Sequence, residues 1–235
     1  MNINRGDRFE YVNSMESTSI GDLIRAGDKR WNGENLETYK KYLIGGYSSS
    51  LIHTVNGKII LLNLSCPVPH PYSRINTIQG THGIFMDYPL RIDVEDEPGS
   101  GPHEKRDPEF NERFDRERTA AYREKYRHPL WKQVGDLAKK VGGHGGMDFL
   151  MDLRWAYCLQ NGLPLDMDVY DLASWTSIYQ LSEVSVKNRS RTVDIPDFTR
   201  GGWRTAKPVD IGGIDLAKMG LESGAVQKDK TQLSV

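Results

Sequence analysis

The 235-residue sequence has no long apolar run, no marked charge imbalance and only two cysteines. No stretch approaches the roughly 18 consecutive apolar residues of a membrane-spanning helix, and residues 1–13 lack the apolar core of a secretory signal. We therefore expect a soluble chain with no membrane partner. The 31 Lys and Arg residues nearly balance the 32 Asp and Glu residues and form no sustained basic stripe. Nucleic acid is thus not expected as a partner.

Nucleotide-binding signatures are also missing. No G-x-G-x-x-G opens a helix after a strand, and no P-loop pattern occurs. The glycine-rich run at 142–146 is followed by no ribose-binding acid at the expected distance. We therefore identify no cofactor-binding residues. Cys66 and Cys158 are expected to be buried free thiols, so cysteine usage leaves the cellular compartment open.

Length and composition allow a large domain with a polar surface and many turns, typical of an α+β protein. Apolar alternation predicts a strand at 8–16, and Asn56-Gly57 suits the two-residue type I′ turn of a hairpin. The predicted strands after residue 16 cover 49–55, 58–64, 74–80 and 82–88.

Helical spacing dominates the second half. One or two helices are predicted over 108–140, with a break at His128-Pro129, and another follows from Met147 to Asn161. A further helix begins at Asp168 with a capping-box-like Asp171. It is expected to direct Leu172, Trp175, Tyr179 and Val186 toward a core. We predict an α+β fold over residues 1–204, with a mixed, largely antiparallel open sheet and helices on one face, followed by a polar peripheral tail at 205–235.

The segment P-H-P-Y-S-R at 69–74 is the first candidate site. Its prolines stiffen the backbone, so that Tyr72 and Arg74 would project from a rigid segment. A tyrosine beside a cationic arginine could act as a proton donor or base, and the arginine could hold a sugar hydroxyl or a phosphate. The alternative is a structural turn with a half-buried tyrosine hydroxyl.

The second candidate is G-G-H-G-G-M-D-F at 142–149. Its glycines leave His144 reachable beside a helix start whose amide groups can bind a polar oxygen, with Asp148 four residues further on. The alternative is a structural helix-start turn, with Asp148 as a first-turn acid. No third ligand accompanies this pair, so no metal site is expected. His53, on the predicted hairpin, could point into a cleft or lie on the surface.

Several motifs occur in an order that resembles glycoside hydrolase family 109, across residues 1–204. They are N-R-G-D-R at 4–8, P-x-P-Y-S-R at 69–74, Q-G-T-x-G at 79–83, G-G-H-G-G-M-D-F at 142–149, G-L-P-L-D-M-D-V-Y-D at 162–171 and P-D-F-T-R-G at 196–201. This family is best known for α-N-acetylgalactosaminidases and belongs to the Gfo/Idh/MocA oxidoreductases. The resemblance implies a C-terminal α+β domain whose open sheet faces NAD and sugar.

The resemblance also implies an elimination mechanism. NAD removes a hydride from C3 of the sugar, the ketone acidifies the C2 proton, and loss of that proton expels the glycosidic oxygen. Water then adds and the hydride returns. Tyr72 matches the family tyrosine and is the expected catalytic or substrate contact, while Arg74, His144, Asp148 and His53 are expected to contact or shape the substrate site.

The family's Rossmann domain and its Y-P-T-H-G-L-G-P segment would lie upstream of Met1. We therefore expect the sugar-facing part of the enzyme, inactive alone and binding no NAD, with homo-oligomers formed through its sheet. A sugar dehydrogenase of the same superfamily and a non-catalytic binding or assembly module, or a truncated fragment, are the alternatives. Full-length relatives often carry a twin-arginine export signal, so location stays open.

Overall fold

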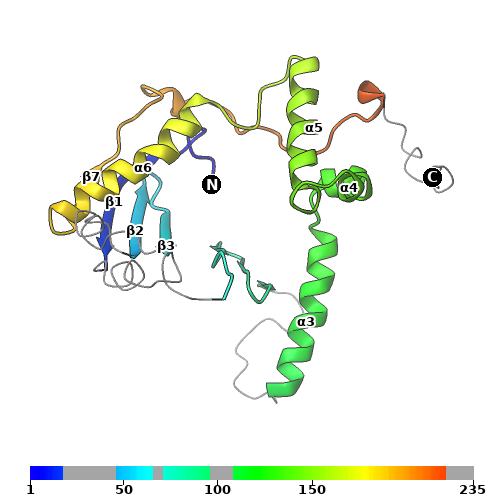
Figure 1. The fold of residues 1–235 in the computed structure, drawn as a ribbon, viewed down its shortest axis with the longest axis horizontal. Helices are drawn as coiled ribbons and strands as arrows, with labels where there is room; N and C mark the ends of the chain where they lie inside the picture. The colour runs from blue at the N-terminus through cyan, green and yellow to red at the C-terminus, as the bar shows by residue number, and fades with distance from the viewer. Residues whose placement is uncertain (18–45, 66–70, 96–107, 221–235) are drawn as a thin grey trace, which may run out of the picture. The chain divides into compact units, whose positions relative to one another are not determined.

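The structure is a computed structural model that describes residues 1–17, 46–65, 71–95 and 108–220, with side chains described from residue 116 in the last range. The chain divides into two compact units. The first contains Met1–His70 and Pro164–Asp210, and the second contains Pro71–Leu163 and Ile211–Val235. Helices and antiparallel sheets occur in both, which confirms the α+β class (Figure 1).

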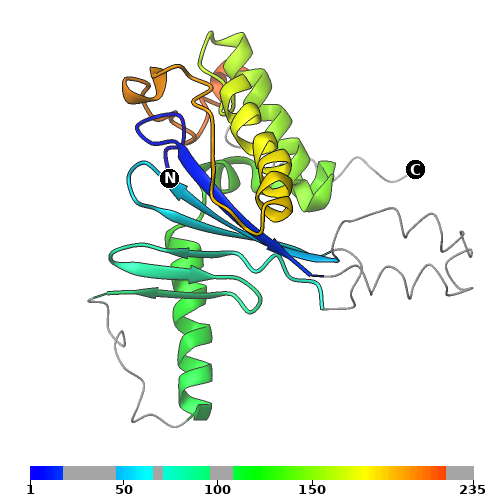
Figure 2. The same ribbon diagram turned by 90° about the vertical axis from the view of Figure 1, so that its left-hand side faces the viewer.

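The first unit is built on a four-stranded antiparallel sheet with the strand order β3-β2-β1-β7. Its strands are β1 (Phe9–Glu16), β2 (Tyr47–Thr54), β3 (Ile59–Ser65) and β7 (Val193–Asp194). Helix α6 (Val169–Lys187) packs along one face of this sheet, as Figure 2 shows. The core between them consists of Phe9, Val12, Ile52, Ile178 and Ile195.

The second unit pairs a smaller antiparallel sheet with three helices. The sheet has the order β4-β5-β6, formed by β4 (Thr77–Gln79), β5 (Gly83–Met86) and β6 (Arg91–Val94). Helix α3 (Pro108–Lys125) packs against β6, while α4 (Pro129–Val141) and α5 (Met147–Gln160) pack against each other. Short 3-10 helices lie at His144–Gly146 and Ala217–Met219 in this unit, and a further one at Gly202–Arg204 belongs to the first unit.

The predicted hairpin at Asn56-Gly57 is confirmed, but its turn type was wrong. The Thr54 amide donates to the Lys58 carbonyl at 3.0 Å, so three residues form the loop. Only Gly57 among them has a positive φ, of +77°. This is the three-residue loop in which a glycine follows a type I turn. The buried carboxylate of Asp7 explains the longer loop, because it accepts from the Asn56 amide at 3.1 Å and from Lys58 Nζ at 2.6 Å.

The predicted helix boundaries agree with the structure, whereas the predicted core face of α6 was wrong. Leu172, Trp175 and Tyr179 are exposed. The face that packs on the sheet carries Ile178 together with three buried polar residues, Asp171, Ser174 and Ser185. These polar side chains can be buried because each one is hydrogen-bonded. The spacing of apolar residues therefore predicted the wrong face of α6 as the buried one.

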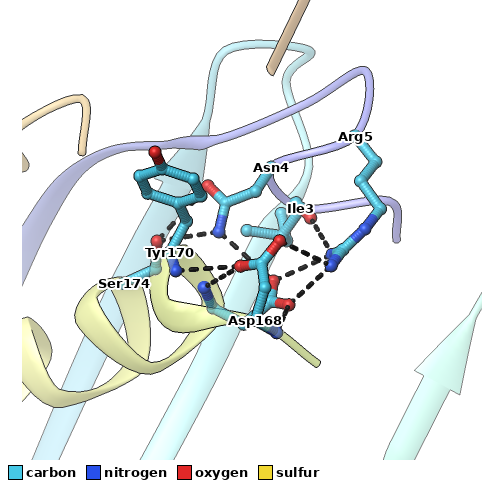
Figure 3. A network of polar contacts seen from close by, with 7 residues as sticks. Ile3, Asn4, Arg5, Asp168, Tyr170 and Ser174 are labelled. Carbon is cyan, nitrogen blue, oxygen red and sulfur yellow. Dashed lines mark hydrogen bonds and ion pairs between the residues drawn. The ribbon is translucent and has the colours of Figure 1, made fainter. Parts of the chain in front are cut away.

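The N-terminal loop supplies the partners for the first turn of α6 (Figure 3). Arg5 donates to both carboxylate oxygens of Asp171, at 2.9 and 2.7 Å, and to Asp168 at 3.2 Å. Asn4 donates to Ser174 at 3.0 Å and to Asp171 at 3.3 Å. Asp168 and Asp171 form the predicted capping box. A bidentate arginine-carboxylate pair gives this contact a fixed geometry as well as strength.

Part of the predicted peripheral tail at 205–235 packs on the second unit. Ile214 is buried there, and its backbone carbonyl and amide form hydrogen bonds with the Gln133 side chain of α4 at 2.8 and 3.0 Å. The domain boundary at 204 itself stays a prediction. No helix in the part of the chain that the structure describes is long and apolar enough to cross a bilayer.

Candidate functional site

Tyr72 lies in the segment that leads into β4, and its side chain is 68% exposed. The Arg74 Nε donates a hydrogen bond to the Tyr72 hydroxyl oxygen at 3.0 Å. The Tyr72 hydroxyl therefore accepts one hydrogen bond from Arg74, and its own hydrogen can still be donated to another acceptor. The same bond raises the pKa of Arg74 above its usual value. The predicted Tyr72-Arg74 pair is thus present in the structure, and residues 69 and 70 of the motif lie outside the described residues.

A second tyrosine, which the sequence reasoning missed, contacts Tyr72. The rings of Tyr72 and Tyr88 meet edge to face, with centroids 5.7 Å apart and planes at 86°. Tyr88 follows β5, and the Asp87 amide beside it donates to the Asn76 carbonyl at 2.9 Å. This bond extends the β4-β5 pairing and brings the two tyrosines together. The adjacent predicted strands at 74–80 and 82–88 indicated this hairpin but not the contact between the two rings.

His144 and Asp148 form the second predicted pair. His144 Nδ1 lies 2.8 Å from Asp148 Oδ2, and both side chains are largely exposed. The turn that precedes α5 makes this possible, because Gly142, Gly143, Gly145 and Gly146 all have positive φ. With a hydrogen on Nδ1 directed at the carboxylate, Nε2 is left to accept from a ligand hydroxyl. This geometry suits either a general base or a sugar-binding imidazole.

The glycine run does not have the form of a dinucleotide site. It follows helix α4 and not a strand, so it lacks the strand-turn-helix arrangement that places a pyrophosphate at a helix N-terminus. All named strand pairs within the described residues are antiparallel. The described residues therefore contain no βαβ cradle of the Rossmann type. The same residues include no group of three His, Cys, Asp or Glu side chains that could hold a metal ion.

His53 lies in the first unit, on β2, and is not part of either pair. Its ring stacks on Tyr11 at 4.7 Å, and its Nδ1 lies 3.0 Å from Glu10 Oε2. Tyr11 and His53 are register partners of β1 and β2, on the sheet face opposite to Val12 and Ile52. Among the described residues, no hydrogen bond joins the Tyr72-Arg74 pair to the His144-Asp148 pair.

Two of the shared motifs have structural roles. Arg5 and Asp7 of N-R-G-D-R hold α6 and the hairpin turn. In P-D-F-T-R-G, the Asp197 carboxylate accepts from the Gly201 amide at 2.8 Å and from Trp203 Nε1 at 3.2 Å. These two motifs therefore stabilise the fold of the first unit.

An antiparallel α+β fold with an exposed tyrosine-arginine pair and a histidine-aspartate pair fits a domain that binds a polar ligand. The family model for the glycosyl hydrolase 109 C-terminal domain matches residues 1–205, and the chain belongs to this family. It is 47% identical over 213 residues to a glycosyl hydrolase family 109 protein of Shewanella woodyi, and 46% identical over 213 residues to an alpha-N-acetylgalactosaminidase of Shewanella oneidensis. These matches cover 91% of the chain but only 45% and 44% of the relatives.

Proposed function

We propose that this chain supplies the sugar-contacting part of an NAD-dependent glycosidase that cleaves α-N-acetylgalactosaminides. The exposed Tyr72-Arg74 pair, in a chain of this family, is the observation that carries the proposal. The name of the Shewanella oneidensis relative supports the choice of sugar. NAD would supply hydride transfer, and we propose that residues other than those described here hold it.

The roles proposed for the side chains follow from their geometry. Tyr72 donates its hydroxyl hydrogen to a sugar oxygen, while Arg74 holds the phenol oxygen in place. His144 accepts a hydrogen from a sugar hydroxyl through Nε2, with Asp148 fixing the ring. A tyrosine and a histidine suit an elimination in which protons move at C2 and at the C3 hydroxyl, because neither step needs the carboxylate pair of most glycosidases.

Binding of methyl α-N-acetylgalactosaminide to the 235-residue chain tests the sugar assignment. Saturation-transfer NMR is expected to detect binding, and Tyr72→Phe is expected to weaken it roughly 3- to 10-fold because one hydrogen bond is lost. Methyl α-glucoside is the matched control ligand. No binding, or equal binding by Tyr72→Phe, would count against the proposal. Tight NAD binding by this chain would contradict the placement of NAD elsewhere.

We also propose that the chain forms homo-oligomers through the face of the four-stranded sheet that is opposite to α6. Leu51 and Leu61 are cross-strand partners on that face, 48% and 60% exposed. Exposed apolar residues clustered on one face are typical of an interface between subunits. His53 alternates with Leu51 along β2, two residues apart, and so lies on the same face. The oligomer would cover His53, so we leave His53 out of the proposed sugar contacts.

A further inference from the structure

The surroundings of Tyr72 identify one more residue of the proposed site. Tyr88 is 49% exposed, yet it makes the ring contact with Tyr72. Edge-to-face aromatic pairs stabilise a particular ring orientation because the positive edge of one ring meets the negative face of the other. Tyr72 is otherwise held only by the bond from Arg74, among the described residues.

The position of Tyr88 is itself fixed by the backbone. Its amide donates to Asp87 Oδ1 at 2.9 Å, and the Asp87 amide donates to the Asn76 carbonyl at 2.9 Å. Thr77 and Met86 are register partners, so Asn76 and Asp87 sit at the end of the same ladder. Tyr88 thus comes from a supported turn, whereas Tyr72 comes from a segment without strand pairing.

Charge favours the same arrangement. The hydrogen bond to Tyr72 is the main cause of the raised pKa of Arg74, and the charges of Tyr88 and Asp87 raise it further.

We propose that Tyr88 is a positioning residue for Tyr72, which it holds by edge-to-face contact in the orientation that binds an N-acetylgalactosaminide oxygen. This inference rests on the proposed function. Tyr88 acts through its ring and not through its hydroxyl, since the contact is between the two rings.

Fluorine NMR of the 235-residue chain, with 3-fluorotyrosine at position 72, tests the positioning directly. Tyr88→Leu is expected to move the fluorine resonance and to weaken methyl α-N-acetylgalactosaminide binding roughly 3- to 10-fold, the strength of an aromatic pair. Tyr88→Phe keeps the ring and is expected to restore both readouts to within twofold of the unsubstituted chain. Tyr126→Leu, which breaks the separate stacked pair with Tyr122, is the control and is expected to change neither.

The outcomes separate the two proposals. An unchanged fluorine resonance in Tyr88→Leu would overturn the positioning role whether or not sugar binds. A moved resonance with unchanged sugar affinity would overturn the link between position and binding, as would a loss in Tyr88→Phe equal to that in Tyr88→Leu. Absence of sugar binding by the unsubstituted chain would instead overturn the proposed function and, with it, the sugar part of this inference.

Discussion

Asp171 is a single carboxylate that joins the N-terminal loop to α6. It accepts two hydrogen bonds from the Arg5 guanidinium, one at each carboxylate oxygen, and is itself buried. Burial raises the pKa of this carboxyl. The hydrogen bonds from Arg5, from the Asp168 backbone and from Asn4 together lower it by more, so that the pKa lies below the ordinary value of 3.8. A carboxylate with a depressed pKa stabilises the fold above its unfolded pKa, and this contribution is lost as the pH falls through its folded pKa.

Asp171→Asn is therefore expected to lower the free energy of unfolding at pH 7 by roughly 1.5–3 kcal/mol, the contribution of hydrogen bonds to charged groups. Because the neutral amide does not titrate, the variant is also expected to lose less stability than the original chain between about pH 4 and pH 2. Urea unfolding across this pH range measures both effects. Asp194→Asn, at an exposed position of β7, is the matched control. Parallel pH profiles for Asp171→Asn and the original chain would contradict the account.

Single-residue patterns predicted some of these contacts and not others. The capping box was predictable because Asp168 and Asp171 are three residues apart. Arg5 was not, because it lies 166 residues from Asp171 in the sequence. Tyr88 was missed for a different reason, because ring contacts across a turn leave no periodic signal. Tyr72 was identified because it lies in a proline-rich segment that also matches a family motif.

At the scale of elements, helix α6 is held on the four-stranded sheet by polar contacts on its buried side. Ser185 is fully buried, accepts from the Ser14 amide at 2.9 Å and donates to the Arg191 carbonyl at 2.6 Å. It links α6 to β1 and to the segment before β7. The spacing of apolar residues therefore predicted which residues form the helix, but it did not predict which side of the helix packs on the sheet.

Ser185→Ala is expected to destabilise the chain by roughly 1–3 kcal/mol, because it removes the partner of the buried Ser14 amide and of the Arg191 carbonyl. Ser182→Ala on the same helix removes a hydroxyl that bonds only its own helix, at Tyr179, and is expected to change stability by less than about 0.5 kcal/mol. Urea denaturation followed by circular dichroism measures the difference. Equal effects of the two substitutions would mean that the buried side of α6 is misassigned.

The turn between α4 and α5 depends on glycine for two different reasons. Gly145 has φ of +70° with open space around it, whereas Gly146 has φ of +101° and a Cβ there would lie 2.7 Å from the Ala138 carbonyl carbon. Gly146 is therefore needed for the close packing of this turn on α4.

Gly145→Ala is expected to cost about 1–2 kcal/mol, the penalty of a left-handed conformation. Gly146→Ala is expected to cost roughly 1–3 kcal/mol more, because the added methyl also overlaps the α4 backbone. Thermal or urea unfolding of the two variants gives the comparison. If Gly146→Ala were no worse than Gly145→Ala, the close packing of this turn on α4 would be refuted.

For the whole molecule, the sequence predicted the α+β class and the family. It did not predict that the strands form two separate sheets, because strand pairing between distant segments depends on contacts that local patterns do not contain. Strand β6 was missed because Arg91–Val94 lies in a charged stretch, where α3 and an Arg118-Asp93 ion pair at 2.9 Å support it.

Leu61→Lys tests the proposed oligomer. A charge placed on the sheet face opposite to α6 would have to be buried unpaired between subunits, so the association constant is expected to fall roughly 100-fold or more. Analytical ultracentrifugation measures it. Tyr179→Lys, on the exposed side of the helix that covers the other face, is the control and is expected to leave association unchanged. A monomeric original chain, or an unaffected Leu61→Lys oligomer, would contradict the proposal.

The central claim is that this chain supplies the sugar-contacting part of a glycosidase. Its most direct test is a chimaera in which residues 1–205 replace the matching segment of the Shewanella oneidensis relative. Release of nitrophenol from 4-nitrophenyl α-N-acetylgalactosaminide is the readout. We predict NAD-dependent release without accumulation of NADH, reduced roughly 100-fold in kcat/KM by Tyr72→Phe. A folded chimaera that binds NAD but releases no nitrophenol, or that only builds up NADH with free sugar, would contradict the claim.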